Sequence, residues 1–271
     1  MRTFHYAVIG VSFSACMPLA FADDIPWGLN PALNDPVWIA IGGYFPKTST
    51  TMQMNSTQLG VGTSIDLQDT LGISDRANAP DAEVRFRIGE KWRIEASYFR
   101  ISQTGNKTID RDIQWGDVVF PANAEVSSKV SFSDFRAAVD YSFYKTSDKE
   151  VGVGLGLHWL QYEASLSSLR VGSDSANVLA PLPVLSVYGQ MALNDQWSVG
   201  ARLDWLSLTV NQYSGGISVG SVSVLYQPFK HLGFGAGYQF MSVDFQSTSG
   251  SFQGKYNQNL QGPTVFLTAS F

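Results

Sequence analysis

The last eight residues of the chain alternate strictly between two faces. One face carries Val265, Leu267, Ala269 and Phe271, and the other carries Thr264, Phe266, Thr268 and Ser270. A period of two predicts a β-strand, with Phe266 as the only apolar side chain on its polar face. Two kinds of protein fit a strand in this place. It could close a β-barrel, or it could form the edge of a soluble sandwich.

Nine further segments show the same alternation. They are 37–45, 81–88, 92–98, 133–143, 151–159, 185–193, 197–205, 217–226 and 232–240. With the closing strand they predict ten antiparallel strands, and a slip at Gly220–Ser221 suggests a bulge in one of them. An extra hairpin from 50–54 and 62–67 would raise the count to twelve. A hairpin at 211–216 that stays outside the wall would lower the count to eight.

The alternation alone does not show which face points inward. In a soluble sandwich the apolar face points to the core, whereas in a membrane barrel it meets lipid. The connections favour the barrel, because those after residues 88, 143, 193 and 228 are short and those after 45, 104, 165 and 246 are longer. Short turns at one end and long loops at the other are typical of transmembrane barrels, with the short turns in the periplasm.

The first 22 residues have the features of a secretory signal peptide. Arg2 precedes an apolar run at 7–15, and Ala20-Phe21-Ala22 matches an A-x-A cleavage pattern. We expect a cleaved signal at 1–22, a periplasmic segment at 23–36 and a barrel over 37–271. Acylation of Cys16 is the alternative, but Phe13 stands where a lipoprotein signal has Leu. Without Cys16 the mature chain has no disulfide, so a closed ring of backbone hydrogen bonds would have to stabilise it.

Five segments, 65–72, 93–99, 112–117, 154–158 and 226–235, are distributed over most of the mature chain. They resemble a family of uncharacterised proteobacterial outer-membrane β-barrel proteins, within the broad OmpA-like and porin-like class. The resemblance implies an all-β, closed antiparallel transmembrane barrel in the bacterial outer membrane, with Phe271 as its assembly signal. It also implies outer-membrane lipid, lipopolysaccharide and the assembly machinery as partners. It implies no particular activity, and Gln68 and Thr70 stand where the family often has acids.

The polar faces of the predicted strands would bring many ionisable side chains into the barrel interior. These are Glu83, Arg85, Arg87, Arg93, Glu95, Asp134, Arg136, Asp140, His158, Arg202 and Asp204. Opposite charges on neighbouring strands should pair, because an unpaired charge in a narrow interior is costly. The result would be either a salt-bridged plug or a narrow pore with an ion preference. Glycines at 152–156 and 233–237 would either relieve crowding or leave a pocket for a small hydrophobic molecule.

These features lead to three functional hypotheses. The first is an integral outer-membrane barrel with a structural or small-pore role, which would have small solutes as partners if its interior is open. The second is a surface interaction protein that uses loops 46–80 and 105–129, with Trp115 and Phe120. The third is a lipid-modifying enzyme, although neither His158 nor His231 lies in the His-x-Ser-Asn pattern of lipid A deacylases.

Several kinds of function are not expected from this sequence. We do not expect an enzyme, because a lone inward histidine is usually part of a polar network. A formal net charge of −5 argues against a nucleic-acid partner. No His and Cys residues have the spacing of a metal site, so we expect no cofactor and no metal ion.

Overall fold

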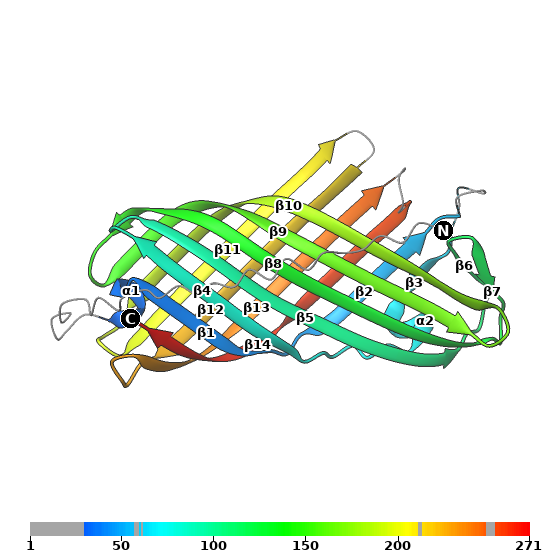
Figure 1. Ribbon diagram of the computed structural model, residues 1–271, viewed down its shortest axis with the longest axis horizontal. Helices are drawn as coiled ribbons and strands as arrows, with labels where there is room; N and C mark the ends of the chain where they lie inside the picture. Colours follow the sequence, from blue (N-terminus) through cyan, green and yellow to red (C-terminus); the bar gives the residue numbers. More distant parts are fainter. Residues whose placement is uncertain (1–29, 57–59, 61, 211–212, 248–252) are drawn as a thin grey trace, which may run out of the picture.

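The computed structural model describes residues 30–56, 60, 62–210, 213–247 and 253–271. Ten antiparallel strands form a closed barrel in the order β1–β4–β5–β8–β9–β10–β11–β12–β13–β14, and β1 pairs back with β14 (Figure 1). The wall strands are β1 (Val37–Tyr44), β4 (Ala79–Ile88), β5 (Trp92–Thr108), β8 (Glu125–Lys145), β9 (Lys149–Ser168), β10 (Gly172–Ala192), β11 (Trp197–Val210), β12 (Tyr213–Tyr226), β13 (Leu232–Ser247) and β14 (Gly254–Ser270). The predicted ten-stranded antiparallel barrel is therefore confirmed. The predicted signal peptide at 1–22 lies outside the described residues.

Short turns join the wall strands at one end, which we call the turn end, and the longer connections lie at the opposite, loop end. One predicted long connection, after residue 165, is wrong. Strands β9 and β10 run on to Ser168 and Gly172, with three residues between them. Pro181 and Pro183 do not interrupt β10, because β10 pairs there with β9 alone and a missing N–H on its free edge costs no ladder bond.

The two faces of β9 exchange their polarity halfway along the strand. Near the turn end the outward residues are Val151, Val153, Leu155, Leu157 and Trp159, and beyond them come Gln161, Glu163, Ser165 and Ser167. The inward residues change in the opposite sense, from Glu150, Gly152, Gly154, Gly156 and His158 to Leu160, Tyr162, Ala164 and Leu166. We call this point on a strand the polarity switch. On the turn-end side apolar side chains face outward, and on the loop-end side they face inward.

The same switch occurs on other strands of the wall. Outward Phe135 on β8 is followed toward the loop end by Ser133, while inward Asp134 is followed by buried Phe132. On β12 the switch lies between inward Val219 and outward Val222, with an unbroken register to both neighbours. The bulge predicted at Gly220–Ser221 is therefore wrong, because the apolar side chains change face while the backbone stays regular. The register shift that does occur lies on β8, between Ser142 and Tyr144.

The exposed apolar side chains on the turn-end side form a belt around the barrel. Leu155, in the middle of the belt, is 67% exposed. Segment 151–159 has the length of about 9–11 residues that a tilted strand needs to cross a bilayer. Such a belt would be unfavourable in water, so it marks the part of the barrel that lies in lipid. The part beyond the polarity switch, which stands in water, has an ordinary inward-facing core.

Four short strands and a helix complete the loop end. Strand β2 (Lys47–Met54) pairs with the loop-end part of β14, and β3 (Ser64–Asp66) pairs with β2. Helix α2 (Leu67–Leu71) begins with an Asp66 cap and ends at Gly72, which has φ +67°. Hairpin β6 (Ile113–Trp115) and β7 (Val118–Phe120) turns at Gly116. Thus the extra hairpin around residue 50 extends the barrel above the belt without adding to the ten-stranded wall.

The turn end is closed by the start of the described chain. Helix α1 (Pro31–Asn34) has a side-chain cap from Asn30, and its Leu33 is fully buried against Leu225. Lys145 donates to the Leu33 carbonyl at 3.2 Å. In the described part of the chain no helix is long and apolar enough to span a membrane.

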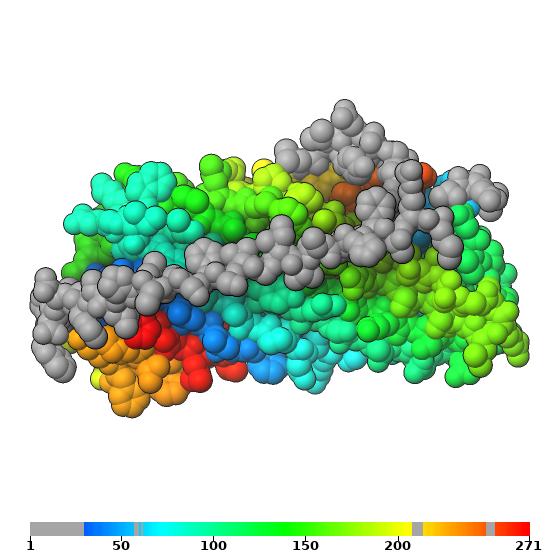
Figure 2. All heavy atoms as spheres, in the orientation of Figure 1, coloured from blue at the N-terminus to red at the C-terminus, as the bar shows by residue number. Residues whose placement is uncertain are grey.

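The red C-terminal segment lies between blue and orange segments at the turn end (Figure 2), where β14 pairs with β1. The backbone of Phe271 exchanges two hydrogen bonds of 2.9 Å with Val37, and its ring stacks on His231 at 5.1 Å. The Phe271 side chain is 52% exposed. Its role as an assembly signal stays a prediction.

The polarity switch predicts that the same substitution has different costs on the two halves of one strand. Leu155→Arg should lower the free energy of unfolding in lipid vesicles by about 2–4 kcal/mol, because it places a cation in the hydrocarbon. The matched variant Ser167→Arg, on the outward face beyond the switch, should change it by less than about 0.5 kcal/mol. Urea unfolding measures both. Equal costs for the two variants would contradict the assigned membrane position.

Candidate functional site: the charge network inside the barrel

All eleven predicted interior residues lie on inward faces of the belt half. They come from five strands: β4 carries Glu83, Arg85 and Arg87, β5 carries Arg93 and Glu95, β8 carries Asp134, Arg136 and Asp140, β9 carries His158, and β11 carries Arg202 and Asp204. Because β4, β5, β8, β9, β10 and β11 are consecutive in the sheet, their polar faces form one continuous charged wall.

Glu95 lies at the centre of this network. Its Oε1 accepts from Arg85 Nε at 3.0 Å and pairs closely with Arg93, and its Oε2 accepts from both Arg136 and Arg202 at 2.9 Å. Its side chain is almost completely buried. A buried carboxylate needs such partners, because its desolvation would otherwise outweigh any gain from folding.

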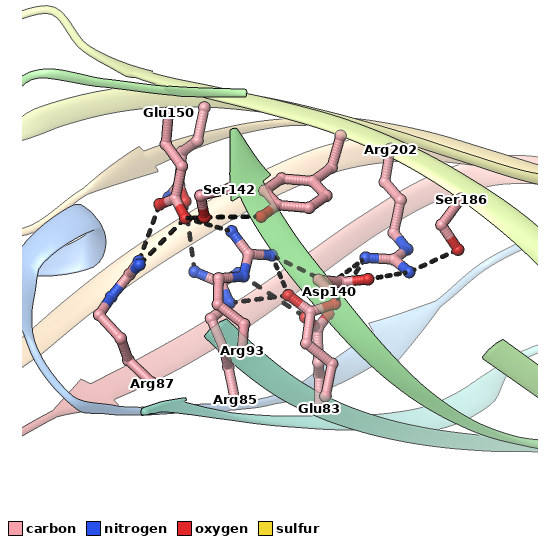
Figure 3. Close-up of polar contacts among 12 residues, drawn as sticks. Glu83, Arg85, Arg87, Arg93, Asp140, Ser142, Glu150, Ser186 and Arg202 are labelled. Atoms are coloured by element: carbon pink, nitrogen blue, oxygen red, sulfur yellow. Dashed lines mark hydrogen bonds and ion pairs between the residues drawn. The ribbon is translucent and has the colours of Figure 1, made fainter. Parts of the chain in front are cut away.

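Arg202 connects this centre to two further acids. Its guanidinium binds Asp140 through both terminal nitrogens, at 2.8 and 3.1 Å (Figure 3). Its Nε binds Asp204 at 2.8 Å. It also donates to the Ser186 hydroxyl at 2.8 Å. A planar guanidinium with several donors suits this position, since a lysine could not bind two carboxylates in the same fixed geometry.

His158 lies between two carboxylates. Its Nδ1 is 2.8 Å from Asp134 Oδ2, and its Nε2 is 3.5 Å from Asp204 Oδ2. Asp204 also pairs with Arg136 Nε at 2.9 Å, so the histidine is joined to the rest of the network. An imidazole oriented by one acid and close to a second can hold and transfer a proton.

A second cluster lies nearer the turn end. Glu150 accepts two hydrogen bonds from Arg87, at 3.0 and 2.8 Å, and pairs closely with the Ser142 hydroxyl. The Ser142 hydroxyl is also 2.8 Å from the Tyr188 hydroxyl, and the Arg93 guanidinium lies 3.9 Å from the centre of the Tyr188 ring. Figure 3 shows Arg93 between Glu150 and Asp140, so it joins the two clusters.

The glycines of β9 make space for these side chains. A Cβ at Gly154 would lie 1.9 Å from Asp140 Oδ1, and a Cβ at Gly152 would lie 2.2 Å from the Tyr188 hydroxyl. Across the barrel, a Cβ at Gly235 would collide with the ring of Phe266, which points inward. These glycines let bulky neighbours lie flat against the wall, in agreement with the crowding interpretation.

A cavity of about 160 Å³ lies between the charged wall and a wall of smaller side chains. Nine of the eleven predicted residues line it; Arg87 and Asp140 do not. The opposite side is formed by residues such as Ser221, Ser223 and Gly42. In the described part of the chain, no group of three or more acids, histidines or cysteines is placed to hold a metal ion.

Sequence reasoning missed two important members of the network. Glu150 is fully buried and binds Arg87, and the Tyr188 ring supports Arg93. Glu150 could have been found, because it shares the even-numbered inward phase of Gly152 and His158 on β9. The importance of Tyr188 follows only from the strand register, which the sequence does not show.

The loop-end half contains no comparable polar site among the described residues. Its interior is an apolar core that includes Trp115, Phe120, Phe132, Tyr162 and Tyr256. The rings of Tyr162 and Tyr256 lie 4.6 Å apart, and burial raises the pKa of both hydroxyls. The surface role expected of Trp115 and Phe120 is therefore wrong, because both are fully buried.

Solved structures with a similar fold are outer-membrane barrels. The outer membrane protease OmpT from Escherichia coli has a TM-score of 0.57 and 11% identity, over 89% of this chain and 98% of that one. The translocator domain of the autotransporter NalP from Neisseria meningitidis has a TM-score of 0.45 and 13% identity, over 89% and 91%. Ail, the attachment invasion locus protein of Yersinia pestis, in complex with a heparin analogue, has a TM-score of 0.36 and 9% identity, over 85% and 97%.

The chain is an integral outer-membrane β-barrel protein. The closed wall, the exposed apolar belt and the similarity to OmpT agree on this fold and confirm the predicted location in the bacterial outer membrane. No protein-family model and no curated protein matches the chain. The narrower resemblance to one proteobacterial family therefore stays a prediction.

The expectation that the chain is not an enzyme must be corrected. OmpT, whose barrel is similar to this one over most of both chains, is a protease. A single inward histidine is therefore no ground for excluding an enzyme, because a barrel of the same fold is catalytic in OmpT.

The central position of Glu95 predicts a large effect of its removal. Glu95→Gln should lower the free energy of unfolding in lipid vesicles by about 3–5 kcal/mol, because it leaves several buried arginines with too few carboxylates. The matched control is Glu163→Gln, which removes an exposed pair with Arg100 at 3.6 Å. This control should cost about 0–1 kcal/mol. Similar losses for both variants would show that the interior network contributes no special stability.

Proposed function

We propose that the protein is a sealed barrel that carries a rigid head above the outer membrane and binds partners at the surface of that head. The head consists of the wall strands beyond the polarity switch together with β2, β3, α2 and the β6–β7 hairpin. In this proposal the membrane part of the barrel has a structural role and is not a small pore. The function of the protein is then to bind partners at the surface of the head.

The observation that carries the proposal is that side chains occupy both halves of the interior, apart from the cavity of about 160 Å³ beside the charge network. The belt half contains the charge network, and the head contains an apolar core in which Trp115, Phe120 and Leu166 are fully buried. Helix α1 covers the turn end, where Arg85 and Lys145 donate to its carbonyls. A solute would have to displace all three layers, which argues against a permanently open pore.

The head offers apolar side chains that no core residue covers. Leu169, at the tip of the β9–β10 hairpin, is fully exposed beside the exposed Arg170. Val119 on the β6–β7 hairpin is also exposed. Exposed apolar residues next to charged ones, on rigid hairpins, suit contact with a protein partner. We therefore propose Leu169 and Val119 as contact residues, in place of the buried Trp115 and Phe120.

The test uses cells that display the protein and their adhesion to cultured cell layers. Leu169→Asp should lower adhesion about tenfold, because burial of one leucine at an interface is worth roughly 1.5–3 kcal/mol. The matched control Ser167→Asp adds the same charge to the same hairpin without removing an apolar side chain, and it should leave adhesion unchanged. Both variants should still show the gel shift of a folded barrel.

Two results would contradict this function. Equal adhesion of wild type and Leu169→Asp would remove the hairpin tip from the proposal. Discrete conductance steps of the purified wild-type protein in a planar bilayer, with a porin as positive control, would show an open pore and overturn the sealed barrel.

Hydrolysis is the second candidate function. The His158 imidazole is held between Asp134 and Asp204 beside the cavity, an arrangement in which a histidine can exchange a proton with a substrate. The similarity to OmpT supports this candidate at the level of the fold. A cavity of about 160 Å³ would take only a few substrate groups at a time.

Hydrolysis is tested with a fluorogenic peptide library and the protein in lipopolysaccharide-containing micelles. If this candidate is correct, wild type and His231→Gln cleave the peptides, because His231 lies in a turn away from the cavity. His158→Gln should then lose at least about a hundredfold in rate, the usual contribution of general acid–base catalysis. Absence of cleavage by wild type, or unchanged cleavage by His158→Gln, would reject the candidate.

A further inference from the structure

The wall is not paired along its whole length between β10 and β11. Their ladder runs from Leu185 opposite Trp205 to Ala192 opposite Ser198. Beyond it, β10 pairs only with β9 and β11 only with β12. Figure 1 shows the loop-end tips of β11 and β12 diverging from those of β9 and β10. We call the unpaired stretch, 172–184 on β10 and 206–210 on β11, the seam.

Two prolines maintain the separation at the start of the seam. The N–H of Ala192 donates to Asp148 next to β9, and the N–H of Leu193 donates to Trp197 on β11. Because N–H directions alternate along an extended strand, the odd-numbered residues of β10 point toward β11. Pro181 and Pro183 therefore lack the two N–H groups that would extend the ladder to β11. Next to the ladder, the sequence therefore lacks the donors that further pairing with β11 would need.

The apolar core of the head reaches the surface at the seam. On β9 the inward residues Leu160, Ala164 and Leu166 are fully covered. On the edge of the seam, the inward residues Val178, Ala180, Leu182 and Leu206 pack against the same core but are only half-buried. These four side chains form an apolar strip that the barrel leaves partly open.

The seam begins in the outermost part of the belt, where Pro183 and Pro181 lie opposite Leu157 and Trp159 of β9, and it opens toward the border. Outward Leu179 on β10 is exposed, as are Pro181 and Pro183, while on β11 the outward apolar face ends at Trp205 and Ser207 follows. An open strand edge cannot lie in hydrocarbon, because its backbone groups would have no partners. At the border, the hydrated headgroup layer can satisfy them. The seam thus connects the apolar head core with the outer leaflet of the membrane.

We propose that the seam binds one alkyl chain of an outer-leaflet lipid against Val178, Ala180, Leu182 and Leu206. The chain comes from the adjoining leaflet, and its headgroup stays in the hydrated layer beside the exposed strand edges. A peptide strand is a poorer occupant, since the edge of β10 lacks the N–H donors at two successive pairing positions. This site is separate from the head surface of the proposed function and from the interior charge network.

Photo-crosslinking with a diazirine-labelled fatty acid tests the seam. The probe is added to the purified protein in phosphatidylcholine vesicles, and mass spectrometry maps the labelled residues. Label should reach the inward residues Ala180, Leu182 and Leu206, in addition to outward residues of the belt, and excess unlabelled fatty acid should remove the inward label. Ala180→Trp should lower the labelling of Leu182 and Leu206 about tenfold, because it covers the area of at least two methylene groups.

The matched control is Ala137→Trp, which adds the same side chain to an outward, lipid-facing position of β8. It should leave the inward label unchanged. Label confined to outward residues would overturn the proposal, as would inward label that excess fatty acid does not displace. The competition experiment uses wild type alone, so it decides the question even if Ala180→Trp does not fold.

Discussion

The long wall strands of this protein pass through two different surroundings, lipid and then water. Within the belt the surroundings are lipid, so apolar side chains face outward and polar ones are forced inward. Beyond the polarity switch the surroundings are water, and the same strand turns its apolar side chains to the interior. The backbone stays regular where the apolar face reverses, and only the order of apolar and polar residues changes. The unbroken register of β12 with both neighbouring strands shows this.

The charge network is a consequence of this arrangement. Polar side chains inside a narrow barrel cannot be fully hydrated, so each must find a partner on another strand. Glu95, on β5, meets this requirement by contacting arginines from β4, β8 and β11. The glycines of β9 provide the space in which Asp140 and Tyr188 can lie. The network and the apolar head core together occupy most of the barrel along its axis and leave the cavity of about 160 Å³ between them and the opposite wall.

The sequence predicted the number of wall strands, which face of each strand points outward in the belt, and all eleven inward ionisable residues. These features follow from the alternation of apolar and polar residues, which is visible in short stretches of sequence. The predicted strands ended at Tyr98, Trp159 and Phe240, whereas the real ones continue for several residues into the head. Each prediction stopped where the apolar phase reversed. The head core, the burial of Trp115 and the role of Tyr188 depend on register and on contacts between distant segments, which no local pattern contains.

The most direct measurement of the polarity switch is a nitroxide scan along β9, from residue 150 to residue 168, in a variant with Cys16, the single cysteine of the sequence, replaced by serine. Labels at odd positions up to 159 should be accessible to oxygen dissolved in lipid, and labels at odd positions from 161 onward should be accessible to a water-soluble nickel complex. Labels at even positions should be protected from both. Lipid accessibility that continues along the odd positions to residue 167, or water accessibility at 151–157, would contradict the account.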